Sequence, residues 1–252
     1  MKTVVVLGPC RSGSSMLAGV LSCLGVDMGD SVSLSKWKHL NKYGCYEDED
    51  FVDLIRRIVI RAGSHLDWFS FPSEEDVLGV QPFFDMEIKR LIKSRQKDLW
   101  GWKFPWSGAV MHLLHQYLVN PFYIVLRRDS KSVARSIYNK FDDRKNFFRN
   151  VSLIFSTRAF WNPYFLFNRF LDFVLHKNDY SDFARLSRSI DSYYDLIFGF
   201  VLGKKYLVLD YDNILKSPER EINKIVNFLG IRPSEKQLSD AYDFVKPRLR
   251  NF

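Results

Sequence analysis

The fold of this chain is decided by the stretch Thr3-Val4-Val5-Val6-Leu7-Gly8-Pro9-Cys10-Arg11-Ser12-Gly13-Ser14-Ser15. Residues 3–7 are an unbroken β-branched, apolar run, which is typical of a strand buried on both faces of a parallel sheet. Residues 14–24 carry apolar side chains at helical spacing and stop at Gly25, a common helix terminator. The stretch therefore predicts a strand, a loop of small residues and a helix.

Similar units follow along the chain. Strands are expected at 99–104, 122–126 and 206–209, and helices at 109–118, 131–138 and from Ser217-Pro218-Glu219 to Gly230. Strands that alternate with helices predict an α/β fold of the P-loop type, with three α/β/α layers and a central parallel sheet. Ligands of such sheets bind beyond the carboxyl ends of the strands. We expect one domain over residues 1–252, with a helical, aromatic-rich insertion at 141–203.

The composition narrows the class of protein. The 252 residues are 46% hydrophobic and 26% charged, which excludes a disordered chain, and no apolar run approaches the ~18 residues of a membrane span. The net charge of +8 favours an anionic partner. Cys10, Cys23 and Cys45 have no metal-binding spacing, so we expect neither disulfides nor a metal site. With no leader-like segment after Met1, we expect a cytoplasmic protein.

The loop between the first strand and its helix predicts an anion site. Backbone N–H groups and a helix N-terminus point into such a loop. The pattern is close to the nucleotide-binding sequence GxxxxGK[ST], but Ser14 occupies the lysine position. The cation stands earlier, at Arg11, and Ser12 and Ser15 add further hydroxyls. We therefore expect a phosphate or a sulfate group at this loop.

This loop resembles the 5′-phosphosulfate loop of the sulfotransferases that use 3′-phosphoadenosine 5′-phosphosulfate (PAPS). Ser14 replaces the usual threonine and keeps its hydroxyl. The resemblance implies that the loop holds the 5′-phosphate and the transferable sulfuryl group. The residues it assigns to this role are Pro9, Cys10, Arg11, Ser12, Gly13, Ser14 and Ser15.

A second motif follows the strand expected at 122–126. Arg128 lies at the end of that strand, and Ser136 follows it by eight positions on the next expected helix. This arrangement resembles the 3′-phosphate motif of the same family, and a guanidinium fork with a hydroxyl suits a phosphate dianion. Weaker similarity to bacterial and tyrosyl-protein sulfotransferases covers 24–25, 41–44, 47, 100–103, 211–218 and 228–230.

The resemblance implies in-line transfer of a sulfuryl group from PAPS to a hydroxyl or amine, with release of 3′,5′-ADP. Arg11 would neutralise charge on the transferred group, and Lys103 would stabilise the departing phosphate. Glu47 matches the position of a catalytic base in tyrosyl-protein-type enzymes. It also precedes an acidic run typical of a helix N-terminus, so a helix cap is the alternative. Asp48 or His39 would then be the next candidates for the base.

The sequence allows two interpretations for each of two segments, the aromatic stretch 141–173 and the basic tail 246–250. Residues 141–173 are crowded with aromatic side chains, which predicts either additional core or a border of the acceptor site. The basic tail 246–250, with Arg248, would either cover the 3′-phosphate, as the resemblance implies, or remain solvated.

Two other functions, a kinase and a nucleic-acid-binding protein, would each require features of their own. A P-loop nucleoside or small-molecule kinase would use Asp210, after the last expected strand, to hold magnesium. A nucleic-acid-binding protein would explain the charge, but the sequence has no recognition module or concentrated basic stripe, so we expect no nucleic-acid partner. The expected partner is an acceptor bearing a hydroxyl, on a carbohydrate, tyrosine, lipid or small metabolite. The sequence does not choose among these acceptors.

Overall fold

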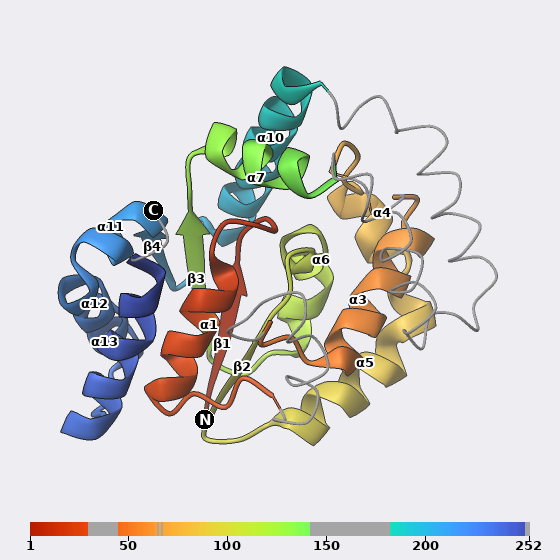
Figure 1. Cartoon of the computed structure of the whole chain (residues 1–252). Coiled ribbons are helices and arrows are strands. Elements are labelled where there is room, and N and C mark those ends of the chain that lie inside the picture. The colour runs from red at the N-terminus through yellow and green to blue at the C-terminus, as the bar shows by residue number, and fades with distance from the viewer. Residues whose placement is uncertain (30–44, 65, 67, 142–181, 250–252) are drawn as a thin grey trace.

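A computed structural model of the chain describes residues 1–29, 45–64, 66, 68–141 and 182–249 (Figure 1). In chain order its elements are β1 (Lys2–Leu7), α1 (Ser14–Cys23), α3 (Glu49–Arg61), α4 (Glu74–Gly79), α5 (Gln81–Arg95), β2 (Leu99–Lys103), α6 (Ser107–Leu114), the 3-10 turn η1 (His115–Tyr117), β3 (Pro121–Arg127), α7 (Ser130–Phe141), α10 (Phe183–Val201), β4 (Tyr206–Asp210), α11 (Tyr211–Lys216), α12 (Pro218–Leu229) and α13 (Glu235–Leu249). Every strand expected from the sequence is present, with its ends within one residue of the prediction.

The described strands form one sheet in the order β2-β1-β3-β4, and every neighbouring pair is parallel. β1 therefore lies between β2 and β3. In the register of the sheet, Val6 of β1 pairs with Lys103, the last residue of β2, and Leu7 pairs with Val125 of β3. The loops that follow β1, β2 and β3 consequently meet at one edge of the sheet, where the site was expected.

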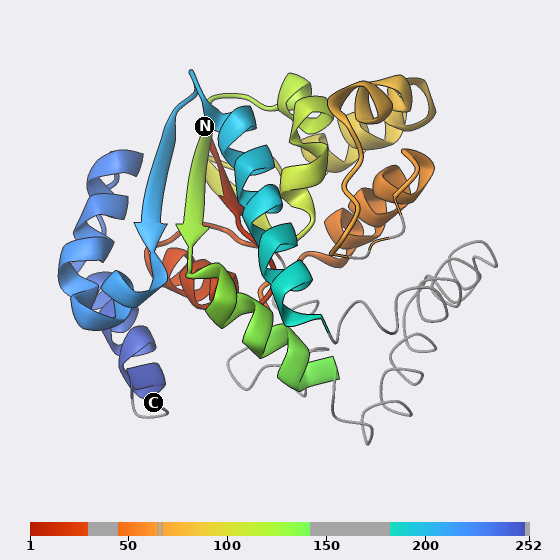
Figure 2. The same ribbon diagram turned by 90° about the horizontal axis from the view of Figure 1, so that it is seen from above.

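Side chains of β1 alternate between two hydrophobic clusters, which is the period expected of a strand. Val4 and Val6 pack with α1, α11, α12 and α13, whereas Val5 and Leu7 pack with α3, α5, α6 and α10. Figures 1 and 2 show the two groups of helices on opposite faces of the sheet. The predicted three-layer α/β/α fold with a central parallel sheet is thus confirmed.

The predicted insertion at 141–203 is described only at Phe141 and from residue 182 onward. There, α10 packs against α6 and α7, and its Ile190, Tyr193 and Ile197 are fully buried. Asp182 caps the N-terminus of this helix, because its side chain accepts a hydrogen bond from the N–H of Arg185. α10 therefore belongs to one of the two helical layers. The aromatic run 142–173 lies outside the described residues.

The approach of β2 to β1 requires a glycine at position 101. A Cβ atom built on Gly101 would lie 2.0 Å from the carbonyl oxygen of Val4, a backbone atom fixed by the sheet. The two strands run beside each other with Gly101 opposite Val4. No side chain fits at this position without displacing one of the strands.

We expect Gly101→Ala to lower the free energy of unfolding by about 1–3 kcal/mol, the usual cost of overpacking. Urea unfolding of the purified variant measures the change. The matched control is Gly79→Ala, because a Cβ at Gly79 meets nothing within 4 Å. The control should change stability by less than about 0.5 kcal/mol. Equal losses in the two variants would show that the strands are not packed as described.

Candidate functional site

Residues with a positive φ shape the loop between β1 and α1. Arg11 has a φ of 65°, and Gly13, which precedes the first residue of α1, has a φ of 96°. Gly13 offers no side chain to cap α1, so the first N–H groups of the helix face the loop uncapped. The hydroxyl of Ser12 is buried and has no partner among the described residues. These donors fit an anion such as phosphate or sulfate.

Tyr211 lies directly against this loop. A Cβ atom at Gly13 would lie 2.3 Å from Cδ2 of the Tyr211 ring, so only glycine leaves room for the ring. The guanidinium carbon of Arg128 lies 4.4 Å from the centroid of the same ring. Tyr211, the first residue of α11, therefore connects the β1–α1 loop with the end of β3.

The two motifs expected to bind the donor meet in the structure. Arg128 donates a hydrogen bond from Nη1 to the carbonyl oxygen of Arg11, at 3.0 Å. Arg11 in turn donates from Nε to Oγ of Ser136, at 3.0 Å. Three side chains capable of binding anions therefore converge on one place: one from the β1–α1 loop, one from the residue that follows β3, and one from α7.

Tyr194 holds the backbone at the end of β3. Its hydroxyl accepts a hydrogen bond from the N–H of Arg128 at 3.0 Å and lies 3.3 Å from the carbonyl oxygen of Leu126, to which it donates. Burial raises the pKa of the Tyr194 phenol well above its ordinary value, so the group stays protonated and can donate. α10 thereby fixes the point from which the Arg128 side chain leaves the sheet.

Lys103 is the most buried cation of the site. Its side chain is 2% exposed, and Nζ lies 2.5 Å from Oε1 of Glu47 and 3.2 Å from Oγ of Ser15. An ammonium group has three N–H donors. The described residues supply these two partners, which leaves one N–H for an anion at the loop. The Glu47 side chain is 21% exposed, so it is partly open to solvent.

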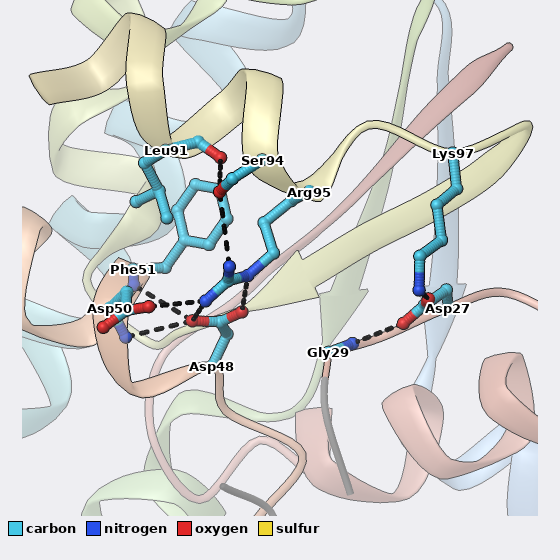
Figure 3. A network of polar contacts seen from close by, with 9 residues as sticks. All are labelled: Asp27, Gly29, Asp48, Asp50, Phe51, Leu91, Ser94, Arg95 and Lys97. Atoms are coloured by element: carbon cyan, nitrogen blue, oxygen red, sulfur yellow. Dashed lines mark hydrogen bonds and ion pairs between the residues drawn. The ribbon is translucent and has the colours of Figure 1, made fainter. Parts of the chain in front are cut away.

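The cap of α3 is Asp48, so the interpretation of Glu47 as the helix cap is wrong. Oδ1 of Asp48 accepts from the N–H groups of Asp50 and Phe51 at 3.0 and 3.4 Å. The side chain of Asp48 is 5% exposed and forms an ion pair with Arg95, as Figure 3 shows. Asp48 is therefore a buried structural carboxylate and a poor candidate for a base.

The remaining predicted residues have varied placements. Ser14 begins α1 and is buried, and Pro9 accepts a hydrogen bond from the N–H of Ser12. Cys10 is half-buried. The side chain of Arg248 and the whole of His39 and of residues 41–44 lie outside the described residues. Within the described part of the chain, no group of three metal-binding side chains occurs, and no helix is long and apolar enough to cross a membrane.

The acid that a kinase would need for magnesium is engaged elsewhere. Asp210 ends β4, as the kinase alternative requires, but its Oδ1 accepts from the N–H groups of Asp212 and Asn213 at 3.0 and 3.3 Å. These bonds cap α11. Three residues of the site received no role from the sequence: Tyr194, Tyr211 and Arg95. Tyr211 opens the range 211–218 that resembles the family, but each of the three acts through a partner distant in sequence, which no local spacing identifies.

The β1–α1 loop, whose donors fit an anion, thus lies beside the Lys103–Glu47 pair. The family model described as the sulfotransferase domain matches residues 1–246, and the chain belongs to this family. Family membership assigns the chain to the enzymes of sulfuryl transfer. No curated protein matches this sequence.

Solved structures of sulfotransferases are similar to this chain at low sequence identity. A sulfotransferase from Alicyclobacillus acidocaldarius is 10% identical with a TM-score of 0.50, and the match covers 100% of this chain and 97% of that one. The sulfotransferase domain of the Synechococcus PCC 7002 olefin synthase is 17% identical with a TM-score of 0.48, over 95% of this chain and 77% of that one. A retinol dehydratase solved with androsterone and inactive cofactor PAP is 17% identical with a TM-score of 0.43, over 98% and 65%. At these identities, the Alicyclobacillus structure supports the fold alone.

We expect Gly13→Ala to lower the free energy of unfolding by about 1–3 kcal/mol, because the methyl group meets the Tyr211 ring and the positive φ strains the backbone. Replacing Tyr211 by alanine in the same chain removes the clash but not the strain. The double variant should therefore lose less stability than the sum of the two single variants, as measured by urea unfolding. Strict additivity would show that the ring does not pack on the loop.

Proposed function

We propose that this protein is a PAPS-dependent sulfotransferase, which transfers a sulfuryl group to a hydroxyl or amine and releases 3′,5′-ADP. The observation that carries the proposal is the position of Lys103 Nζ, between Oε1 of Glu47 and Oγ of Ser15. A buried cation and an accessible carboxylate thus adjoin an anion-binding loop. The pair combines a group that stabilises negative charge with a group that accepts a proton.

The donor would be held by the converging motifs described above. The β1–α1 loop and the N-terminus of α1 would bind the 5′-phosphosulfate, since the uncapped N–H groups and the unpartnered Ser12 hydroxyl are donors that an anion satisfies. Arg128 and Ser136 would bind the 3′-phosphate. Arg248 remains a candidate for the same phosphate through the family resemblance.

When bound, PAPS supplies an electrophilic sulfuryl group joined to a phosphate that can depart. The chain's own residues would do the rest by position and charge. Arg11 and the N-terminus of α1 would compensate negative charge at the loop, and the remaining N–H of Lys103 would point to the departing oxygen. Glu47, which is partly exposed, would accept the proton of the acceptor hydroxyl at its carboxylate. Sulfuryl transfer of this kind requires no metal ion.

The acceptor is proposed only as a class. A carboxylate base serves any hydroxyl or amine brought to it, so a carbohydrate, a tyrosine, a lipid and a small metabolite all remain acceptors by this chemistry. Residues 141–173 are proposed to border the acceptor or to add to the core, as their composition predicts. A screen of acceptors with labelled PAPS distinguishes the classes.

The donor assignment is tested by calorimetry with two nucleotides. The protein should bind 3′,5′-ADP without metal, whereas a kinase would prefer ATP with magnesium. Preference for ATP with magnesium would refute the proposal.

We expect Arg128→Ala to weaken binding of 3′,5′-ADP by about 2 kcal/mol, the value of a lost charge-assisted hydrogen bond. Binding of 5′-AMP, which lacks the 3′-phosphate, should change much less. Titration calorimetry with both nucleotides gives the comparison. Equal losses for the two nucleotides would show that Arg128 does not read the 3′-phosphate.

We expect Glu47→Gln to lower turnover of labelled PAPS by about 10²- to 10⁴-fold, because the amide keeps the shape of the side chain but accepts no proton. The affinity for 3′,5′-ADP should be retained, since Glu47 is not assigned to the donor. Turnover is measured with the best acceptor from the screen. Unchanged turnover would remove Glu47 from the reaction.

A further inference from the structure

The start of α3 is held by one arginine at the end of α5. Arg95 donates from Nε to Oδ2 of Asp48 at 2.6 Å and from Nη2 to Oδ2 of Asp50 at 2.5 Å. Its Nη1 donates to Oγ of Ser94 at 3.3 Å (Figure 3). The hydrogen bond to Asp48 raises the pKa of Arg95 above its ordinary value. The planar guanidinium thus contacts both acidic residues at once, which a lysine could not do in the same way.

Asp48 is enclosed on its other side by a segment attached to β2. A Cβ atom at Gly29 would lie 3.3 Å from the Asp48 Cβ, so the two residues are in close contact. The same segment is bonded to β2, because the carbonyl oxygen of Asp27 accepts a hydrogen bond from the N–H of Gly101 at 2.8 Å. Figure 3 shows the Asp48 side chain below the guanidinium of Arg95, with Gly29 to one side. The first residue before α3 is therefore fixed relative to β2.

The first turn of α3 also packs on β2 itself. Phe51 stacks on Trp102, with ring centroids 4.4 Å apart and an interplanar angle of 5°. Trp102 immediately precedes Lys103, and Glu47 immediately precedes Asp48. The two members of the Lys–Glu pair are thus each one residue away from an anchored neighbour. Their meeting depends on how the chain enters α3.

We propose that Arg95 is a positioning residue for the transfer reaction: by holding Asp48 it directs Glu47 onto Lys103. This inference rests on the proposed function of Glu47 and Lys103. Without Arg95, Asp48 would be a buried carboxylate that has lost its cation, and such a group moves toward water. Movement of Asp48 carries the adjacent Glu47 away from Lys103, while the donor loop stays in place.

The experiment follows the Lys103 amine directly. Acetic anhydride acylates exposed, unpaired lysines, and mass spectrometry reports the rate at each residue. In the protein without substitutions, Lys103 should react slowly, because its side chain is 2% exposed and is paired with Glu47. Arg95→Ala should raise the rate at Lys103 about fivefold or more, as local opening becomes easier. Glu47→Gln should raise it as well, and adding Arg95→Ala to that variant should have little further effect.

The matched control is Arg57→Ala. Arg57 joins the same two helices through Glu87, with Nη1 2.9 Å from Oε2, but lies away from the start of α3. The control should change the acylation rate of Lys103 by less than about twofold. Under the proposal, access to Lys103 depends on the contact of Arg95 with Asp48, and Arg57 takes no part in that contact. Equal acceleration by the two variants, or none by Arg95→Ala, would overturn the inference. If Arg95→Ala does not fold, Arg95→Lys, which keeps the charge but not the fork, is compared with the control in the same way.

Turnover supplies a second measurement. In Arg95→Ala, kcat should fall about tenfold or more while the affinity for 3′,5′-ADP is kept, and the fall should vanish in the Glu47→Gln background. A fall of equal size in that background would overturn the inference. Failure of the unmodified protein to bind 3′,5′-ADP would instead refute the proposed function, and the acylation rates would still decide whether Arg95 positions Glu47.

Discussion

The site depends on a single buried ammonium group, Nζ of Lys103. A charge removed from water is unfavourable unless partners compensate it, and here the carboxylate of Glu47 and the hydroxyl of Ser15 do so. One partner comes from the segment that leads into α3 and the other from the first turn of α1. One cation therefore connects segments that belong to opposite faces of the sheet. Any displacement of α3 relative to the sheet would leave this charge poorly compensated.

The parallel sheet provides the common edge on which this pairing is built. β1 lies between β2 and β3, so the loop after β1 has Lys103, the last residue of β2, on one side and Arg128, which directly follows β3, on the other. The contacts of Arg128 with the carbonyl oxygen of Arg11, and of Arg11 with Ser136, are a direct result of this strand order. An antiparallel arrangement of β2 or β3 would send its cation to the opposite edge.

Three further side chains contact the segments that carry these groups. Tyr194 holds the backbone at Arg128, the ring of Tyr211 lies on Gly13, and Arg95 holds Asp48. Each support comes from a different helix, α10, α11 or α5, and acts on a segment that leads into the site. The segments that carry Arg11, Arg128 and Glu47 are therefore each tied to a helix, which is the kind of support that the proposed transfer reaction would require.

The sequence by itself determined the strands, the glycine-containing loop and the two motifs with Arg11, Arg128 and Ser136. It could do so because strand burial, helix ends and anion-binding loops depend on residues close together along the chain. It left Glu47 undecided between base and cap, because four acidic residues in a row have the same local pattern whichever one caps the helix. Only the tertiary structure assigned the cap to Asp48, by placing Arg95 beside it and Lys103 beside Glu47. Tertiary packing likewise revealed the supporting contacts of Tyr194, Tyr211 and Arg95, since these contacts join elements far apart in the chain.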